Sequence, residues 1–394
     1  MDMRLPTLYE GDFSGKRVFV RVDYNVPVQE GVIQDDRRIR ASLPTLDYLL
    51  SRGASLVLAS HLGRPKGGPD PKYSLAPIAT HLSGLLNRPV RLVVDWTSPV
   101  SLQPGEVVLL ENLRFHPGET QNDPELARLL FRWADVYVCD AFGSVHRAHA
   151  SVDALPRLFT HRYAGLLLMA EWENAQRVLS NITPPYLLIV GGAKVADKLP
   201  ILQNLLDKID RLLIGGGMSY TFLKAQGLPI GRSLCEAEHI EAARTILSTL
   251  QARGKKFLLP LDSVAATQFA ENAPPRVFLH LPDQFPEEYM GLDIGPQTIA
   301  SARTFIEGAR TILWNGPMGV FEWKSFQMGT LRIAEFVAEE TQAGAYSLIG
   351  GGDTASAIEM LGLSEKVSFV STGGGALLEL LGGQTLPGIA ALFS

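Results

Sequence analysis

The chain has 394 residues, of which 46% are hydrophobic and 20% are charged. At roughly 150 residues per domain, this length predicts two or three domains. The composition is that of an ordinary globular protein and excludes a disordered or fibrous chain. A net charge of −5 argues against a general nucleic-acid-binding protein.

The two cysteines, Cys139 and Cys235, are far apart in the sequence and form no CxxC pair. This spacing excludes a disulfide framework and a cysteine-rich zinc site, and it suits a reducing compartment. No apolar run reaches the roughly 18–20 residues that cross a bilayer. Residues 1–11 lack the apolar stretch of a signal peptide. We therefore expect a soluble, cytoplasmic protein without a membrane partner.

In the first part of the chain, short β-branched or leucine-rich runs alternate with helical patterns. The predicted strands are Arg17–Val22, Ser55–Ser60, Arg91–Val94, Val107–Glu111 and Val136–Cys139, and the predicted helices are Arg38–Ser51, Ser74–Leu86 and Pro124–Trp133. Strands that are apolar on both faces and separated by helices predict a parallel sheet covered on both sides.

A longer helix is predicted over Leu166–Ser180, and the paired prolines Pro184 and Pro185 prevent its continuation. We place the domain boundary in this region, with residues 1–170 in the first domain and 171–376 in the second. A helix is stiffer than a Gly/Ser linker, so we expect a helical hinge that brings together substrates bound on the two domains.

The second part repeats the alternation of strands and helices. The predicted strands are Tyr186–Val190, Arg211–Ile214, Lys256–Leu259, Val277–His280, Thr311–Trp314, Ser347–Ile349 and Val367–Val370, and the predicted helices are Lys198–Asp207, Glu236–Ala252, Pro296–Gly308, Phe326–Glu340 and Thr354–Leu361. The fold class is therefore α/β, with two doubly wound parallel-sheet domains.

Arginine-containing polar clusters follow four predicted strands of the first part. They are the segments Arg21–Pro27, His61–Pro65, Glu111–His116 and Asp140–Arg147. Each cluster alone is more often a capped turn or a solvated surface charge than a ligand site. In open α/β sheets, however, ligands bind beyond the carboxyl ends of the strands, and gathering several guanidinium groups is costly unless an anion pairs with them. We predict a phosphate or carboxylate site.

Glycine runs follow the strands of the second part. They are Gly191–Gly192, joined to Lys194 and Lys198, and Gly215–Gly217, Gly350–Gly352 joined to Asp353, and Gly373–Gly375. Glycine lets backbone N–H groups approach an anion closely, and a helix that begins directly afterwards adds its positive end. A single run would indicate only a tight turn, but four runs favour a polyphosphate ligand.

Several familiar motifs are absent from the sequence. It has no GxxxxGK[ST] loop, no protein-kinase HRD or DFG motif, no GxSxG and no HExxH. A dehydrogenase with a doubled Rossmann architecture is the main alternative enzyme, but no GxGxxG opens the first helix. A metabolite sensor without turnover is the non-enzymatic alternative. The remaining class is phosphoryl transfer without a Walker loop.

The chain resembles the phosphoglycerate kinase family from end to end. The resemblance runs through RVDYNVP, SHLGRP, LENLRFHPGE, DAFGSVHRAHAS, GGAKVADK, GGGMSYTFLK, MGLDIGP, WNGPMGVFE, GGGDTASA and STGGGALLELL. It implies two Rossmann-like domains, with about Leu377–Ser394 returning to the first domain. It also implies reversible transfer between 1,3-bisphosphoglycerate with ADP and 3-phosphoglycerate with ATP, a requirement for Mg²⁺, and a monomer. Tyr24, Tyr289 and the segment Leu261–Ala266 depart from the usual pattern.

The resemblance carries site residues over position by position. The phosphoglycerate site is expected at Asp23, Asn25, Arg38, His61, Leu62, Gly63, Arg64, Arg114 and Arg147. The nucleotide site is expected at Lys194, Lys198, Gly215, Gly291, Asn315, Glu322, Gly351, Gly352, Asp353 and Thr354, with Asp353 next to the metal.

The chemistry of this reaction fits those residues. The acceptor is a carboxylate, which is ionised near neutral pH and needs no general base. Catalysis then rests on positioning and on stabilising negative charge. We expect Arg38 and Lys198 to hold the charge of the moving group, with help from the amides near Gly352 and Gly375. The presence of Arg38, Lys198 and Asp353 favours an active kinase over a sensor.

Overall fold

The computed structural model describes residues 4–393, and these divide into two compact units. The first unit runs to Glu173 and also contains the segment from Thr385 onward. The second unit is Asn174–Gln384. The boundary between the two units falls inside helix α5 (Leu166–Leu179).

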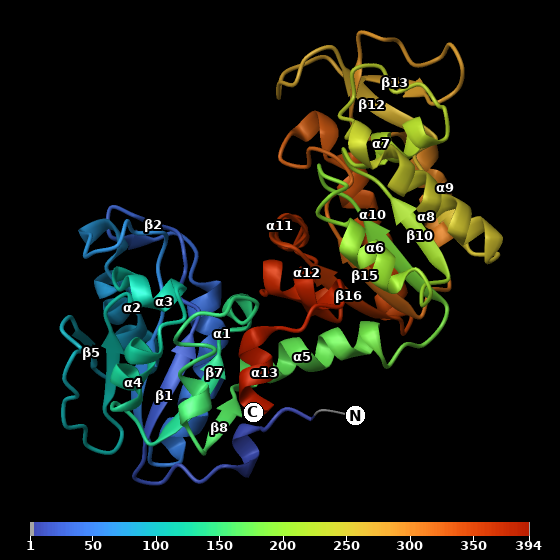
Figure 1. The fold of residues 1–394 in the computed structure, drawn as a ribbon. Coiled ribbons are helices and arrows are strands. Elements are labelled where there is room, and N and C mark those ends of the chain that lie inside the picture. Colours follow the sequence, from blue (N-terminus) through green and yellow to red (C-terminus); the bar gives the residue numbers. More distant parts are fainter. Residues whose placement is uncertain (1–3, 394) are drawn as a thin grey trace. The chain divides into compact units, whose positions relative to one another are not determined.

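The first unit is built on a six-stranded parallel sheet in the order β5-β6-β4-β1-β7-β8 (Figure 1). Its strands are β1 (Arg17–Val22), β4 (Ser55–Ala59), β5 (Val90–Val93), β6 (Val107–Leu110), β7 (Val136–Asp140) and β8 (Arg162–Ala164). The helices are α1 (Arg37–Ser51), α2 (Ala76–Leu86), α3 (Pro117–Thr120), α4 (Pro124–Phe131) and α13 (Pro387–Phe393). A small hairpin, β2 (Val28–Gln29) with β3 (Val32–Ile33), follows β1.

The second unit contains a six-stranded parallel sheet in the order β11-β10-β9-β15-β16-β17. Its strands are β9 (Tyr186–Val190), β10 (Arg211–Ile214), β11 (Lys256–Leu258), β15 (Thr311–Asn315), β16 (Tyr346–Gly350) and β17 (Phe369–Val370). The helices are α6 (Leu199–Leu205), α7 (Ser219–Ala225), α8 (Ile240–Ala252), α9 (Pro296–Ile306), α10 (Met328–Gln342), α11 (Gly352–Met360) and α12 (Gly375–Leu381).

Short 3-10 helices complete the elements. They are Leu8–Glu10, Pro71–Tyr73, Leu113–Phe115, Phe142–Ser144, Pro156–Leu158, Ala237–His239, Lys324–Phe326 and Ser364–Lys366.

One expected strand of the second unit lies outside the parallel sheet. The Val277–His280 prediction corresponds to β13 (Arg276–Leu279), which belongs to a separate antiparallel sheet with β12 (Asp262–Ala266) and β14 (Met290–Ile294). No helix separates β12 from β13, and a parallel pair needs a crossover connection. β13 is also exposed or half-buried along its length, unlike a central parallel strand.

The return of the chain to the first unit begins at Thr385, later than the Leu377 expected from the resemblance. Residues 377–381 still belong to α12, which packs on α6 of the second unit. The side-chain amide of Asn204 donates a hydrogen bond to the carbonyl of Leu381 (2.8 Å), which holds the end of α12 in place.

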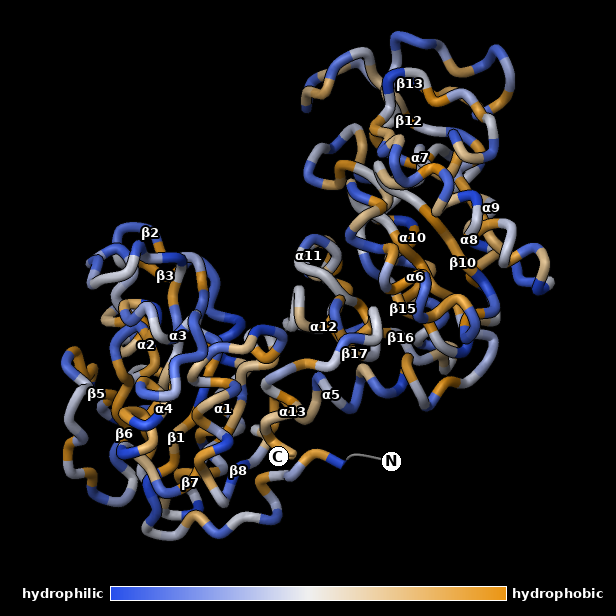
Figure 2. The backbone as a smooth tube through the Cα atoms, in the orientation of Figure 1, coloured by the Kyte–Doolittle hydropathy of each residue, from blue (hydrophilic) through white to orange (hydrophobic). Residues whose placement is uncertain are grey.

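Each parallel sheet forms the centre of its own apolar core. The strands of both sheets are mostly hydrophobic in Figure 2, and the connecting loops are mostly hydrophilic. β4 and β9 are buried along their whole length, as strands covered on both faces must be. Among residues 4–393, no helix is long and apolar enough to cross a membrane.

Candidate active site

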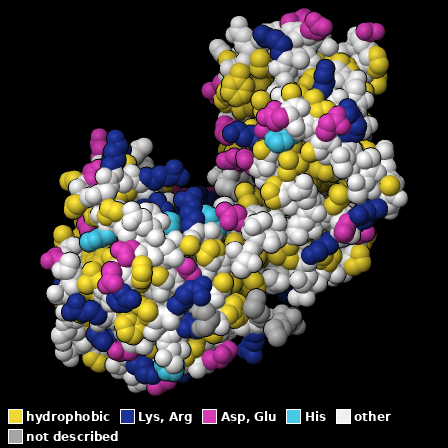
Figure 3. Space-filling model, in the orientation of Figure 1, with side chains coloured by type: hydrophobic (Ala, Val, Ile, Leu, Met, Phe, Trp, Pro, Cys, Tyr) yellow, Lys and Arg dark blue, Asp and Glu magenta, His cyan; other side chains and the backbone are white. Residues whose placement is uncertain are grey.

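The carboxyl ends of four neighbouring strands of the first unit carry the predicted anion-binding loops. β6, β4, β1 and β7 are adjacent and parallel, so the residues that follow them lie along one edge of the sheet. We call this the arginine edge, defined by Asp23, Asn25, His61–Arg64, Arg114 and Arg147. Figure 3 shows Lys, Arg and His side chains gathered on one part of the first unit's surface.

Side-chain contacts connect the loop after β1 to the loop after β4 and to helix α1. The side-chain oxygen of Asn25 accepts a hydrogen bond from the backbone N–H of Gly63 (2.9 Å). Arg38, in the first turn of α1, donates to the carboxylate of Asp23 (3.1 Å). Its guanidinium is only partly buried, so further donors of this planar fork remain available to a ligand.

The loop after β4 has a backbone conformation that requires glycine. Gly63 has a φ of +62°, and the ring of Tyr73 lies 2.3 Å from the position that a Cβ would occupy. The carbonyl of Gly63 accepts a hydrogen bond from the guanidinium of Arg114 (2.7 Å), and the backbone N–H of Leu62 donates to Asn112 (3.2 Å). These contacts hold Arg114 in a fixed direction.

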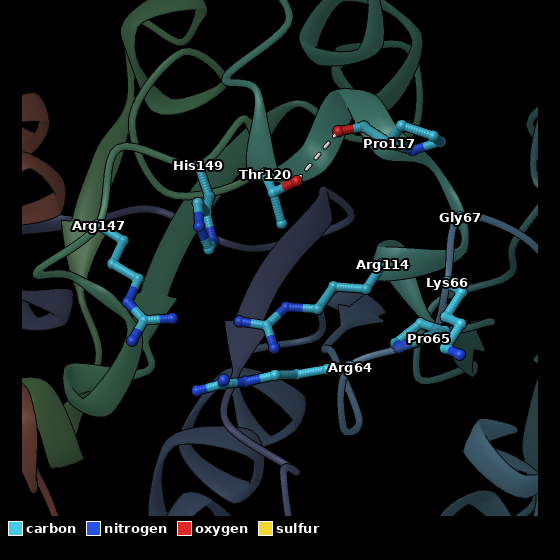
Figure 4. Close-up of a pocket in the computed structure, with 9 residues that line it drawn as sticks. All are labelled: Arg64, Pro65, Lys66, Gly67, Arg114, Pro117, Thr120, Arg147 and His149. Carbon is cyan, nitrogen blue, oxygen red and sulfur yellow. Dashed lines mark hydrogen bonds between the residues drawn. The ribbon is translucent and has the colours of Figure 1, made fainter.

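Three arginines converge on a cavity of about 530 Å³ at this edge. The side chains of Arg64 and Arg114 extend toward that of Arg147, with His149 next to them (Figure 4). Lys66, Gly67, Pro65, Pro117 and Thr120 complete the lining.

The electrostatics of this cavity favour an anion. Burial, followed by the charge of Arg114, lowers the pKa of His149 to about 4. Burial, followed by the charge of Arg21, lowers the pKa of His61 well below its usual range. Burial and the neighbouring guanidinium groups of Arg21, Arg147 and Arg64 also lower the pKa of Arg114. Such shifts mark positive charge in excess of the local acidic groups, which a phosphate would offset.

Four further residues at this edge were not predicted as site residues from the sequence: Arg21, Lys66, Thr120 and His149. Arg21 is 1% exposed and donates to the hydroxyl of Ser151 (2.8 Å), and its guanidinium lies 3.2 Å from Nδ1 of His61. Arg21 could have been noticed in the sequence, because it is an arginine inside a mostly hydrophobic strand. Lys66 and Thr120 carried no such signal.

In the second unit, the carboxyl ends of β9, β10, β15 and β16 bring glycine backbones into contact. We call this the glycine edge, defined by Gly191–Gly192, Gly215–Gly216, Asn315–Gly316 and Gly350–Gly352. The N–H of Gly191 donates to the carbonyl of Asn315 (3.0 Å). Gly216 has a φ of +65°, and a Cβ there would lie 2.5 Å from the backbone nitrogen of Gly192. Side chains are therefore excluded where these strands end.

Lys198 lies at this edge and is largely buried. Its ammonium group donates to the side-chain oxygen of Asn315. Burial lowers the pKa of Lys198, while the nearby carboxylates of Asp197 and Asp353 oppose the shift. The amide nitrogen of Asn315 is buried without a hydrogen-bond partner. A desolvated cation next to an unsatisfied donor is an arrangement that an anionic ligand would complete.

The start of α11 adds further groups to the glycine edge. Gly351 has a φ of +91° and precedes the first turn of this helix. The hydroxyl of Thr354 accepts a hydrogen bond from the N–H of Gly316 (2.7 Å). Asp353 is exposed in the same turn.

The other predicted nucleotide residues are more dispersed. Lys194 and Glu322 are exposed in loops. Gly291 lies on β14 of the antiparallel sheet, where the hydroxyl of Tyr220 occupies the space that a Cβ would need. Gly375 opens α12 directly after Gly374, which has a φ of +51°.

Comparisons with known proteins agree over almost the whole chain. The model of the family described as "Phosphoglycerate kinase" matches residues 8–384. A phosphoglycerate kinase of Thermus thermophilus is 50% identical over 393 residues, which cover 98% of this chain and 99% of the relative. One from Solibacter usitatus is 48% identical over 390 residues, with 97% of each covered.

The chain belongs to the phosphoglycerate kinase family.

Solved structures agree with this assignment. The phosphoglycerate kinase of Coxiella burnetii superposes with a TM-score of 0.92 at 41% identity and covers 99% of each chain. That of Pyrococcus horikoshii gives 0.84 at 31% identity, covering 99% of this chain and 98% of the other. The expected two-domain α/β class is confirmed, and so is the expected activity, the glycolytic phosphoryl transfer of phosphoglycerate kinases.

Two departures from the usual phosphoglycerate kinase pattern are accommodated by packing. Tyr24 is fully buried, and its hydroxyl lies 2.9 Å from that of Ser42 on α1. The ring of Tyr289 packs edge-on against Phe278 of β13, with 4.6 Å between centroids.

The residues at the start of α11 fit a magnesium–nucleotide complex. Mg²⁺ is usually held by one or two carboxylates together with substrate phosphates. Asp353 offers one exposed carboxylate, close enough to Lys198 to oppose the lowering of its pKa. This donor set suits an ion that arrives with a nucleotide.

Proposed function

We propose that the arginine edge binds 3-phosphoglycerate or 1,3-bisphosphoglycerate and that the glycine edge binds ATP or ADP with Mg²⁺. The observation that carries this proposal is the convergence of Arg64, Arg114 and Arg147 on one cavity. Burial and neighbouring positive charges lower the pKa values of Arg114 and His149, and three guanidinium groups gathered in this way need a strongly anionic ligand.

On the first unit, the substrate site comprises Asp23, Asn25, Arg38, His61, Leu62, Gly63, Arg64, Arg114 and Arg147. The guanidinium groups pair with the phosphate in two-point contacts. Arg38 lies beside Asp23 at the start of α1, where its remaining donors face the reacting carboxyl group of the substrate.

On the second unit, the nucleotide site comprises Lys194, Lys198, Gly215, Gly291, Asn315, Glu322 and Gly351–Thr354. Backbone N–H groups at the start of α11 receive phosphate oxygens, as at other helix N-termini. Asp353 holds the metal, which neutralises phosphate charge when it is bound.

Electrostatic stabilisation accounts for catalysis by these residues. The attacking carboxylate is already ionised, so no side chain has to remove a proton. Lys198 stabilises the negative charge of the transferring group, and its partial desolvation strengthens that interaction. Arg38 and the amides of Gly352 and Gly375 contribute in the same way.

A coupled assay tests the proposal. The reaction contains ATP, Mg²⁺ and 3-phosphoglycerate, and ADP formation is measured with each component omitted in turn. We expect turnover only in the complete mixture and its loss when EDTA is added. ADP formation without the acid would indicate hydrolysis and contradict the proposed acceptor.

We also propose that the protein acts as a monomer in the cytoplasm and has no nucleic-acid partner. Both cysteines are free, as in proteins of reducing compartments, and the net charge is −5. Light scattering after size-exclusion chromatography should give the mass of one 43.0 kDa chain. A mass near twice that value would contradict the monomer.

A further inference from the structure

Asp140 is a buried acid that none of the site contacts above uses. It is the last residue of β7 and has no exposed surface. One carboxylate oxygen accepts the backbone N–H groups of Leu167 (3.0 Å) and Leu168 (3.2 Å) in the first turn of α5. Asp140 therefore caps the N-terminus of the helix that continues into the second unit.

The contact between Asp140 and α5 is unusually close because of Gly165. A Cβ at this position would lie 2.1 Å from the carboxylate oxygen. The N–H of Gly165 donates to the carbonyl of Cys139 (2.7 Å). The start of α5 is thus held directly against the carboxyl end of β7.

Thr45 connects the same point to α1, the helix that carries Arg38. Its hydroxyl accepts the backbone N–H of Leu166 (2.8 Å), and it opposes the rise that burial causes in the pKa of Asp140. Thr45 is also fully buried. One hydroxyl and one carboxyl group therefore join α1, β7 and the first turn of α5.

The substrate loop reaches this network through Tyr24, which lies between Asp23 and Asn25. Asp140 pairs in register with Val22 of β1, two residues before Tyr24, and the hydroxyl of Tyr24 lies 2.9 Å from that of Ser42 on α1. Burial raises the pKa of Asp140 to about 7, and its second carboxylate oxygen has no hydrogen-bond partner. Retaining an acid in such a place is costly, which favours a role for its hydrogen bonds.

We propose that Asp140 is a positioning residue that couples occupation of the phosphoglycerate site to the first turn of α5, through Thr45 on α1 and Tyr24 in the substrate loop. This inference rests on the proposed function, because it assumes that the acid binds at Asp23, Asn25 and Arg38. Binding of the acid reduces the motion of α1 and of the substrate loop after β1. Thr45 and Asp140 then extend this reduced motion to the backbone amides of Leu166–Leu168.

Hydrogen exchange of these amides tests the coupling without requiring turnover. In the unmodified protein, saturating 3-phosphoglycerate alone should slow exchange at Leu166–Leu168 several-fold. Thr45→Val keeps the shape of the side chain but removes its hydrogen bond to Leu166 and its polar contact with Asp140, so the slowing should be lost while the acid still binds. Equal slowing in the two proteins would overturn the proposal. Absence of binding to the unmodified protein would instead overturn the proposed function, and the inference with it.

Steady-state kinetics provides the second test. Asp140→Ala should lower kcat about tenfold or more, with the KM for ATP changed less than twofold. Asp140→Asn retains an oxygen that can accept from α5, and it should recover most of the lost kcat. If the asparagine variant is as impaired as the alanine variant, the hydrogen bonds are not the cause and the proposal fails.

A matched control separates positioning from general stability. Asp123 also caps a helix of the first unit, accepting the N–H of Glu125 at the start of α4 (2.9 Å). Asp123→Ala should lower the unfolding midpoint and leave kcat unchanged below that midpoint. An equal loss of kcat in Asp123→Ala and Asp140→Ala would show that Asp140 acts only through stability.

Discussion

The two candidate binding edges are built on similar parallel sheets but recognise anions by different means. The arginine edge presents side chains, and three guanidinium groups line its cavity. The glycine edge removes side chains, so that backbone groups and a single partly buried lysine, Lys198, are presented. Side-chain forks select a small anion of defined shape, whereas exposed backbone N–H groups accept a longer polyphosphate. The difference indicates that each edge suits one of the two substrates.

Lys198 is the position at which the glycine edge depends most on a side chain. Lys198→Ala should lower kcat by about 10²-fold or more, the usual cost of losing one electrostatic donor. Lys194→Ala, in the same loop but exposed, should mainly raise the KM for ATP. Steady-state kinetics distinguishes the two effects. A Lys198→Ala enzyme with normal kcat and only a raised KM would assign Lys198 to simple binding.

Arg38 tests whether the arginine edge requires a planar fork or only a positive charge. Arg38→Lys keeps the charge but loses the two-point geometry, and we expect kcat to fall by about tenfold or more. Arg40→Lys is the matched control, because Arg40 is exposed on the same helix and pairs with Asp36. Equal activity in the two variants would reduce Arg38 to a general surface charge.

Gly216 tests whether the glycine edge depends on close backbone contact. Gly216→Ala places a Cβ 2.5 Å from the nitrogen of Gly192, so the KM for ATP should rise several-fold and the unfolding midpoint should fall. Gly227→Ala has a similar φ, +77°, but open space around it. It therefore carries only the backbone strain, about 1–2 kcal/mol. If both variants bind ATP equally well, crowding at Gly216 is irrelevant to the site.

His149 gives the smallest expected effect, and it is visible as a pH dependence. Its pKa is lowered to about 4 in the folded protein and is near 6.5 when unfolded. Between these values only the unfolded chain takes up the proton, so stability falls as pH drops from 6.5 toward 4. Between pH 7.5 and pH 5, the unfolding free energy of the unmodified protein should therefore fall further than that of His149→Gln. The difference between the two proteins should be about 1 kcal/mol, once solvent screening is considered. Urea unfolding curves that shift in parallel for both proteins would contradict this.

The sequence predicts the sheets better than the parts around them. β1, β9 and β10 have the predicted bounds, because strands buried on both faces are continuous apolar runs. Helix α7 was not predicted. Its residues are buried on almost every side, so the sequence shows no apolar stripe of helical period. β12 and β14 were missed as well, because Asp262, Ser263, Gly291 and Asp293 interrupt any continuous apolar run in them.

For the candidate site, the position of a residue after a strand was the informative signal. Arg64, Arg114 and Arg147 follow different strands, and the structure brings them to one cavity. Thr120 lines the same cavity from α3, and nothing in its local sequence distinguishes it from a surface threonine. The sequence places Asp140 directly after a predicted strand. Its contact with α5 could not be predicted, because it depends on how the chain returns to β8.

The discontinuity of the first unit has a consequence for biosynthesis. Segment 385–393 packs back onto this unit, where the N–H of Gly388 donates to the carbonyl of Val145 (2.9 Å) and the carbonyl of Leu392 accepts from Arg162 (3.3 Å). A ribosome makes these residues after the whole of the second unit. The second unit, Asn174–Gln384, is therefore complete before the first, although N-terminal domains usually fold first during synthesis. A nascent chain that stalls just after Gln384 would hold a complete second unit beside an incomplete first unit.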